Sequence, residues 1–104
     1  LTLFTGSGDD TLFLVNGVLP PTIALDGGAG NDTYHMNSAS SANVFVLDQL
    51  GANNSIVVSV PAGQTAFVNA PNRVLIAGNL AVIASPNVAN LLLDAQGAGA
   101  SVVW

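Results

Sequence analysis

The sequence predicts an all-β fold, a parallel β-solenoid (β-roll or β-helix-like) built from a repeat of about 22 residues. Three observations carry this prediction. Val, Thr, Asn, Gly and Pro are frequent whereas Lys and Glu are absent, a composition that disfavours helices. Short apolar segments alternate with turn residues, so a new strand begins roughly every ten residues. One type of turn also recurs at a fixed spacing, which is the signature of a repeat architecture.

The expected strands follow from short runs of apolar and β-branched residues bounded by Gly, Pro, Asn, Asp or Ser. In chain order they cover residues 1–4, 11–15, 22–25, a strand beginning at 33, 43–47, 55–60, 66–68, 73–76, 80–84, 89–93 and 101–104. No segment keeps apolar residues at helical spacing for long, so no helix is expected.

The repeat becomes visible when the chain is aligned on its Gly- and Asn-rich turns. Successive repeats then begin at Leu3, Leu25, Leu47, Val68 and Leu93, and their second strands begin at Thr11, Thr33, Ser55, Arg73 and Ser101. A unit this short cannot bury its own apolar residues, so the repeats must stack as rungs with parallel pairing between equivalent strands. We expect one domain over residues 1–104, with about four to five rungs. A β-sandwich is the alternative, but it does not explain a turn that recurs in register.

Alternation along the strands assigns two columns of side chains. The inward column is expected to contain Leu12, Tyr34, Ile56, Val74 and Val102. The outward residues are expected to be Phe13, His35, Val57, Leu75 and Val103, with Ala24, Val46, Phe67 and Leu92 on the other strands. Because the outward residues are also mainly apolar, part of the outer surface should be covered. Residues 80–84, another part of a larger protein, or identical copies are the candidates.

Composition excludes several classes of function. The chain has six acidic residues, one cation at Arg73 and a formal net charge of -5, so nucleic acid is not expected as a partner. The absence of cysteine excludes disulfides and zinc–thiolate sites. Every apolar run is interrupted too early for a membrane helix. The chain begins with Leu1, which indicates a processed or excised piece, a segment of a larger protein or a subunit of an assembly.

Two turns carry a recognisable motif. Residues 27–35, GGAGNDTYH, match the nonapeptide G-G-x-G-x-D-x-U-x at every fixed position, where U is a large apolar residue. Residues 5–13 match it except for Thr5 in place of the first Gly. Calcium prefers six to eight hard oxygen ligands, and glycines let a tight turn present its carbonyls beside an Asp carboxylate. Stacking the two turns would bring Asp10 and Asp32 around one ion, with carbonyls near Gly6, Gly8, Gly28 and Gly30.

These motifs resemble the RTX (repeats-in-toxin, or haemolysin-type calcium-binding) family. The resemblance implies a parallel β-roll that holds Ca²⁺ between neighbouring rungs, with the backbone carbonyls of Asp9 and Asn31 as further ligands, and it implies bacterial secretion. The family's motifs usually follow every nine residues, whereas here they lie 22 residues apart and only on one side. Later turns decay to GANN and GAGA, so a second, poorer ion is expected at most near Asn53 and Asn54.

The other polar residues have structural interpretations. His35 has no second His or Cys as a metal partner and is expected to be an ordinary strand residue. Asp26, Asp48 and Asp94 each follow a Leu and are expected to cap turns. Arg73 without nearby carboxylates does not indicate a carbohydrate site, and Trp104 is expected in a core or an interface. No catalytic constellation is present, so we expect no enzyme.

The sequence therefore predicts a calcium-binding structural or adhesive module of a secreted or cell-surface protein. Its expected partners are calcium and neighbouring rungs or identical copies, which would contact its apolar outer strands and open ends, without membrane insertion. A self-assembling subunit of an extracellular filament or surface layer is the first alternative, because both ends are predicted to be unpaired strands. The calcium-binding tail of a secreted hydrolase is the second.

Overall fold

A computed structural model describes residues 1–14, 20–37, 42–48, 50–51, 53–69, 74–77, 80–86 and 88–103. Arg73 and Trp104 lie outside this range. The described residues form eleven strands and no helix, so the all-β prediction is confirmed. The strands are β1 (Thr2–Phe4), β2 (Thr11–Phe13), β3 (Thr22–Asp26), β4 (Thr33–Asn37), β5 (Ala42–Val46), β6 (Asn54–Val60), β7 (Thr65–Asn69), β8 (Val74–Ala77), β9 (Leu80–Ala84), β10 (Val88–Ala95) and β11 (Ser101–Val103).

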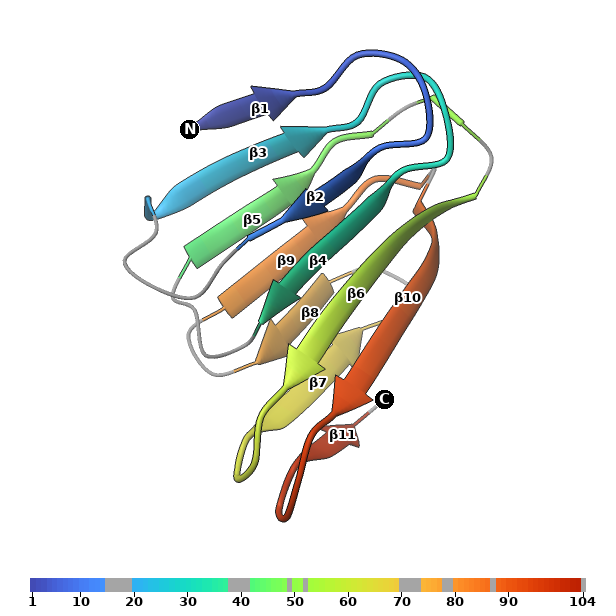
Figure 1. Ribbon diagram of the computed structural model, residues 1–104. Helices are drawn as coiled ribbons and strands as arrows, with labels where there is room; N and C mark the ends of the chain where they lie inside the picture. Colours follow the sequence, from blue (N-terminus) through green and yellow to red (C-terminus); the bar gives the residue numbers. More distant parts are fainter. Residues whose placement is uncertain are drawn as a thin grey trace.

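Two sheets face each other (Figure 1). The larger sheet has the strand order β1-β3-β5-β9-β8-β7-β11, and the smaller has the order β10-β6-β4-β2. Neighbouring strands pair in parallel except around β8, which pairs antiparallel with both β7 and β9. The chain crosses from the larger sheet to the smaller after β1, β3, β5 and β9, and it returns after β2, β4, β6 and β10. Strands of similar sequence therefore lie beside one another although they are far apart in the chain.

The predicted spacing of 22 residues is the pairing register of the first strands. Leu12 lies beside Tyr34, and Tyr34 lies beside Ile56, in the smaller sheet. Leu3 lies beside Leu25 in the larger sheet. Each equivalent side chain therefore points the same way, and the apolar residues form continuous columns between the sheets.

The third repeat departs from the predicted register by one residue. Leu25 pairs with Val46 rather than with Leu47, and Leu47 is 47% exposed at the start of the following turn. From Val46 to Ser55 the chain has one residue more than from Leu25 to Thr33. A shift of one residue exchanges the two faces of a strand, so Val46, which we expected outside, is fully buried.

The predicted last two repeats are wrong. β9 rather than β7 stacks on β5, and β10 rather than the segment at 73–76 stacks on β6. Leu93 therefore lies in the smaller sheet and Ser101 in the larger one, the reverse of the prediction. Between β6 and β9 the chain makes an antiparallel excursion through β7 and β8, which turns Leu75 into the core instead of outward.

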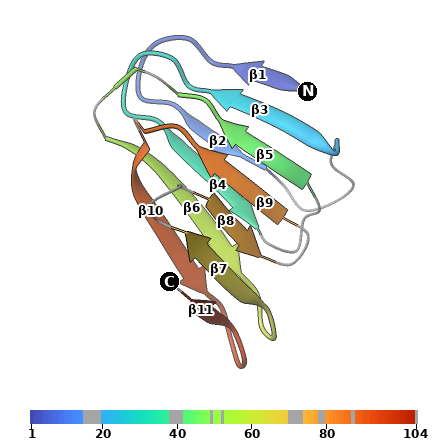
Figure 2. The same cartoon turned by 180° about the vertical axis from the view of Figure 1, so that it is seen from behind.

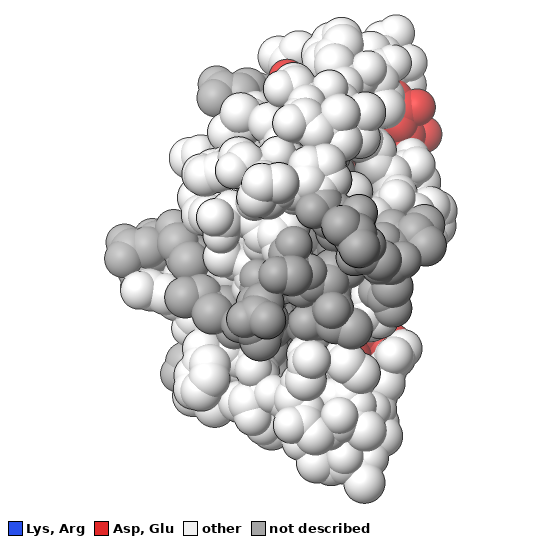
Figure 3. All heavy atoms as spheres, turned by 90° about the vertical axis from the view of Figure 1, so that its left-hand side faces the viewer, with Lys and Arg blue, Asp and Glu red and all other residues white. Residues whose placement is uncertain are grey.

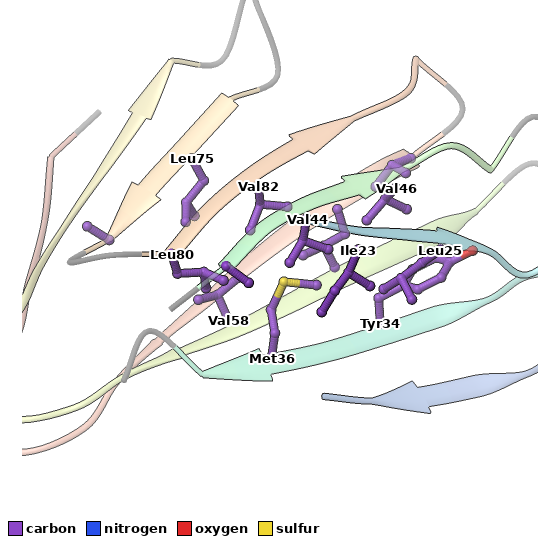
Figure 4. Packing of buried hydrophobic residues seen from close by; sticks show 14 of the residues in the cluster. Ile23, Leu25, Tyr34, Met36, Val44, Val46, Val58, Leu75, Leu80 and Val82 are labelled. Carbon is purple, nitrogen blue, oxygen red and sulfur yellow. The ribbon is translucent and has the colours of Figure 1, made fainter. Parts of the chain in front are cut away.

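The core fills the space between the sheets, as Figure 4 shows. Ile23, Leu25, Val44 and Val46 from the larger sheet meet Tyr34, Met36, Ile56 and Val58 from the smaller sheet. Of the inward column, Tyr34 and Ile56 are buried as predicted and Leu12 is partly buried. The side chains of Val74 and Val102 lie outside the described part.

Several residues of the predicted outward column do lie outside. Phe13, Phe67, Leu92 and Val103 are exposed, and the Phe13 ring stacks on His35 with centroids 4.6 Å apart. The segment 80–84 does not cover this surface, contrary to one expectation. It forms β9 within the larger sheet, because its backbone pairs with β5 and β8.

Candidate metal centre

Three turns that connect the larger sheet to the smaller one lie side by side at one end of the molecule (Figures 1 and 2). We call them the first turn (after β1), the second turn (after β3) and the third turn (after β5). Backbone hydrogen bonds continue between the first two: Ala29 N donates to Gly6 O at 2.9 Å, and Gly8 N donates to Ala29 O at 2.7 Å. The parallel pairing of the strands thus extends into the turns.

Close stacking of the turns depends on glycine. Gly28 has a φ of 87°, and a Cβ atom there would lie 1.9 Å from the Gly6 carbonyl oxygen. Gly30 likewise leaves no room for a Cβ, which would lie 2.1 Å from the Gly8 oxygen. Thr5, where the motif has its first glycine, donates its hydroxyl to the Gly27 carbonyl at 2.9 Å. Gly28 and Gly30 are therefore required by the approach of the second turn to the first, whereas a Cβ on Gly6 or Gly8 would meet nothing within 4 Å.

An exposed column of side chains joins the three turns. Asp9 Oδ1 accepts a hydrogen bond from Asn31 N at 2.9 Å, and Asn31 Oδ1 accepts one from Asn53 N at 3.1 Å. The side chains of Asp9 and Asn31 are thus engaged with backbone N–H groups of the next turn. The RTX resemblance implies a different role for these two residues, in which their backbone carbonyls are the ligands.

A second column, running beside the first, is buried. Asp32 Oδ1 accepts a hydrogen bond from Asp10 N, and Asn54 Oδ1 accepts one from Asp32 N, both at 2.8 Å. Asp32 and Asn54 are fully buried. The structure therefore brings Asp10 and Asp32 together one turn apart, as the 22-residue spacing predicted.

One oxygen of each aspartate in this column has no partner. Asp10 Oδ2 and Asp32 Oδ2 are buried and accept no hydrogen bond. Gly27 wraps closely over the second of these carboxylates, because a Cβ on Gly27 would lie 2.2 Å from Asp32 Oδ2. A buried acceptor without a donor costs about 1–3 kcal/mol, and a charged one costs more. A cation at these oxygens would remove that cost.

The charges around Asp32 also favour a cation at this position. Burial raises the pKa of Asp32, the hydrogen bond from Asp10 N opposes this rise, and the neighbouring Asp48 and Asp10 carboxylates raise the pKa further. The side chains of Asp32 and Asp48 are close enough to interact directly. The ionised form of Asp32 therefore lacks compensation from the described side chains.

Tyr34 and Asp48 support this region, a role that the sequence did not reveal. Gly27 N donates to Tyr34 Oη, which donates to Asp48 Oδ2, both at 2.7 Å. Burial, and the hydrogen bond to Asp48, raise the pKa of Tyr34, so its hydroxyl stays protonated. A polar Tyr at the large apolar position of the motif, with an Asp 14 residues later, was the available signal.

The prediction of turn-capping aspartates holds for two of three residues. Asp26 Oδ1 accepts from Gly28 N at 3.0 Å, and Asp48 Oδ1 accepts from Leu50 N at 3.2 Å. Asp94 instead lies exposed in β10, where its carboxylate accepts a hydrogen bond from Gln96 Nε2. Its sheet differs from that of Asp26 because β10 stacks on β6.

The oxygen atoms available as metal ligands come from few carboxylates and many backbone carbonyls. No three His, Cys, Asp or Glu side chains among the described residues converge as metal ligands. Asp10 and Asp32 fit a hard cation through their free oxygens, and turn carbonyls would have to supply the rest. The Gly6 carbonyl already accepts a hydrogen bond and could contribute only its second lone pair.

Two further observations complete the description. No helix long and apolar enough to cross a membrane is found in the described part of the chain. Comparison with known proteins finds no matching family model, no matching curated protein and no matching solved structure.

Proposed function

We propose that this chain is a calcium-stabilised parallel β-solenoid that serves as a structural or adhesive module of a secreted or cell-surface protein. The observation that carries the proposal is the pair of buried, unpartnered oxygens on Asp10 and Asp32 in adjacent turns. The continuous 22-residue register supports the solenoid, and the two motifs with their RTX resemblance support Ca²⁺ and bacterial secretion.

Calcium would act here by compensating charge. Without a cation, two carboxylates in adjacent turns repel each other, and the burial of Asp32 favours its neutral form. An ion that binds the folded state and not the unfolded state stabilises folding by mass action. Extracellular calcium modules bind with Kd values of about 10⁻⁴ to 10⁻³ M, so folding would be favoured outside the cell.

The test is a calorimetric calcium titration of the wild-type chain and of the Asp10→Asn/Asp32→Asn variant, with circular dichroism recorded alongside. We expect the wild type to bind Ca²⁺ at millimolar concentration or below and to gain β-sheet signal or thermal stability. The variant should show neither effect. A wild type that releases no binding heat and has the same stability in chelator as in calcium would contradict the proposal.

Self-association is a second candidate, favoured by the open edges of both sheets. Among the strands that the structure describes, β1 and β2 each pair on one side only, at the same end of the molecule. Leu3 points the same way as the buried Leu25 but is 39% exposed, and Phe4 and Phe13 are 67% and 66% exposed. The side shown in Figure 3 is mostly uncharged, with small acidic patches and no basic atoms among the described residues.

In this second candidate, another copy would cover β1 and β2 and bury these side chains. Light scattering across a concentration series separates the candidates. A hydrodynamic radius that increases with protein concentration, and increases less in the Leu3→Asp variant, would favour assembly. A monomer at all concentrations, with and without calcium, would exclude it.

A further inference from the structure

The third turn differs from the first two at the end of the buried column. Asp10, Asp32 and Asn54 occupy equivalent positions, 22 residues apart, but the third residue is an amide instead of a carboxylate. Asn54 is fully buried. Unlike the two aspartates, it leaves neither of its polar side-chain atoms without a partner.

Two hydrogen bonds fix the orientation of the Asn54 amide. The atom facing Asp32 N must be the oxygen, and it accepts at 2.8 Å. The other atom faces the carbonyl of Leu50, so it must be the nitrogen, and it donates at 2.7 Å. The amide thus bridges the second turn and its own turn.

Asp32 makes the first of these bonds and lacks the second. Its Oδ1 accepts from Asp10 N at the same distance of 2.8 Å, which orients its planar carboxylate as the Asn54 amide is oriented. Asp32 Oδ2 then takes the place of Asn54 Nδ2 and lies within its own turn, against Gly27. An acceptor therefore stands where the third turn has a donor, and it has no hydrogen-bond partner.

We propose that Asn54 ends the calcium column: its amide nitrogen supplies the positive partner that a calcium ion supplies beside Asp10 and Asp32, so the third turn is complete without metal. The inference rests on the calcium site proposed above. It differs from the sequence-based expectation, which allowed at most a second, poorer ion near Asn53 and Asn54. It also makes one residue the determinant of how far along the stack calcium binds.

The neighbouring residues agree with an end to the column at this point. Below Asn54 the next strand presents Val88, which is buried and has no side-chain oxygen. The carbonyl of Leu50 is used by Asn54 Nδ2. The carbonyl of Asp48 accepts a hydrogen bond from the Ser85 hydroxyl. Two of the carbonyls that could serve an ion in the third turn are therefore engaged with side-chain donors.

The test exchanges the amide at residue 54 and the carboxylate at residue 32, one at a time. Asn54→Asp replaces the donor with an acceptor, so this variant should melt below the wild type in chelator. It should also bind about one more equivalent of Ca²⁺ than the wild type and gain more thermal stability from calcium. Native mass spectrometry and calorimetry count the ions, and a melting curve in chelator gives the metal-free stability. Asn54→Ala is the matched control, which should lose stability without binding an additional ion.

The reverse exchange, Asp32→Asn, keeps the test decisive if Asn54→Asp does not fold. This variant should bind fewer ions than the wild type and melt above it in chelator, because an amide nitrogen replaces the unpartnered oxygen and can donate to the neighbouring Asp48 carboxylate. An Asn54→Asp protein that binds the same number of ions as the wild type, or an Asp32→Asn protein that is no more stable in chelator, would overturn the inference. A wild type that binds no calcium would overturn the proposed function itself.

Discussion

Stacked turns close two different ends of this molecule, and they do so by different means. At the end described above, buried carboxylates lie between the turns and two of their oxygens have no partner. At the other end, residues 61–64 and 96–100 stack through backbone bonds, with Gly63 N donating to Ala98 O and Ser101 N donating to Gln64 O. The Thr65 and Ser101 hydroxyls add a bond of 2.9 Å.

The comparison shows that this chain can stack turns without any buried charge. The turns at residues 61–64 and 96–100 contain no acidic residue, and the nearby Asp94 is exposed. Turn formation alone therefore does not account for burying Asp10 Oδ2 and Asp32 Oδ2 at the first end. The cation proposed at these oxygens would account for their burial.

The largest expected losses of stability test whether the parallel stacked strands and the antiparallel excursion through β7 and β8 share one core. Ile56 lies in β6, among the parallel stacked strands, and Leu75 lies in β8, in the antiparallel excursion. Each of these side chains is 1% exposed. Replacement of either by Ala should lower the free energy of unfolding by about 2–5 kcal/mol. Urea denaturation of both variants should show one transition. A Leu75→Ala protein with two transitions would show that the excursion folds on its own.

A glycine pair compares the two ends directly. Gly28 and Gly63 have similar φ values, 87° and 80°, but a Cβ would meet the Gly6 oxygen at Gly28 and nothing within 4 Å at Gly63. Gly63→Ala should cost only the backbone strain, about 1 kcal/mol. Gly28→Ala adds a steric clash and should cost about 3 kcal/mol or more in total. Equal melting temperatures for the two variants would contradict the close stacking of the first two turns.

Tyr34→Phe should have a smaller effect that is confined to the first end. The change removes the acceptor for Gly27 N and the donor to Asp48, at a cost of about 1–3 kcal/mol. Thermal denaturation in chelator measures this loss. His35→Ala, on the outer face of the same strand, is the control and should cost less. A greater loss for His35→Ala would argue against the buried Tyr34–Asp48 pair.

The smallest expected effect is a dependence of stability on pH. The pKa of Asp32 is raised above its usual value of 3.8, so the folded state holds this proton more tightly than the unfolded state. In chelator, the resulting stabilisation is complete below about pH 3.9 and is lost as the pH rises through the folded pKa. Urea midpoints from pH 4 to 7 should therefore fall more steeply for the wild type than for Asp32→Asn.

Calcium should reverse this trend, because it binds the ionised carboxylate. With saturating calcium, the wild-type midpoint should rise or stay level over the same pH range. Identical pH profiles for the wild type and Asp32→Asn in chelator would show that Asp32 is not the titrating group.

The part of the fold that the sequence predicted is the part where turns repeat. The motif placed Asp10 beside Asp32, and the 22-residue spacing placed Thr33 beside Ser55. The prediction failed for the last two repeats, where alternating apolar residues were the only signal. Such alternation does not distinguish a parallel strand from an antiparallel one. The Leu-Asp pair at residues 93 and 94 resembles that at 25 and 26, but it lies in the other sheet.

The candidate site was also predicted only in part. Its motif residues were identifiable because their types and spacing suit calcium. The contributions of Asn54, Tyr34 and Asp48 depend on which atom each side chain presents after folding. The direction of the Asn54 amide, for example, follows from its contacts with Asp32 N and Leu50 O. The contact with Asp32 N arises from the stacking of turns 22 residues apart, and no local pattern encodes it.

The most direct test of the central claim is a calcium titration followed by ¹H–¹⁵N NMR spectra of the folded chain. If calcium binds the unpartnered oxygens of Asp10 and Asp32, the amide signals of Asp10, Gly28 and Asp32 should shift. Those of Gly63 and Ser101 at the other end should stay unchanged. Spectra that do not change at millimolar calcium, or shifts centred on the turns at residues 61–64 and 96–100, would contradict it.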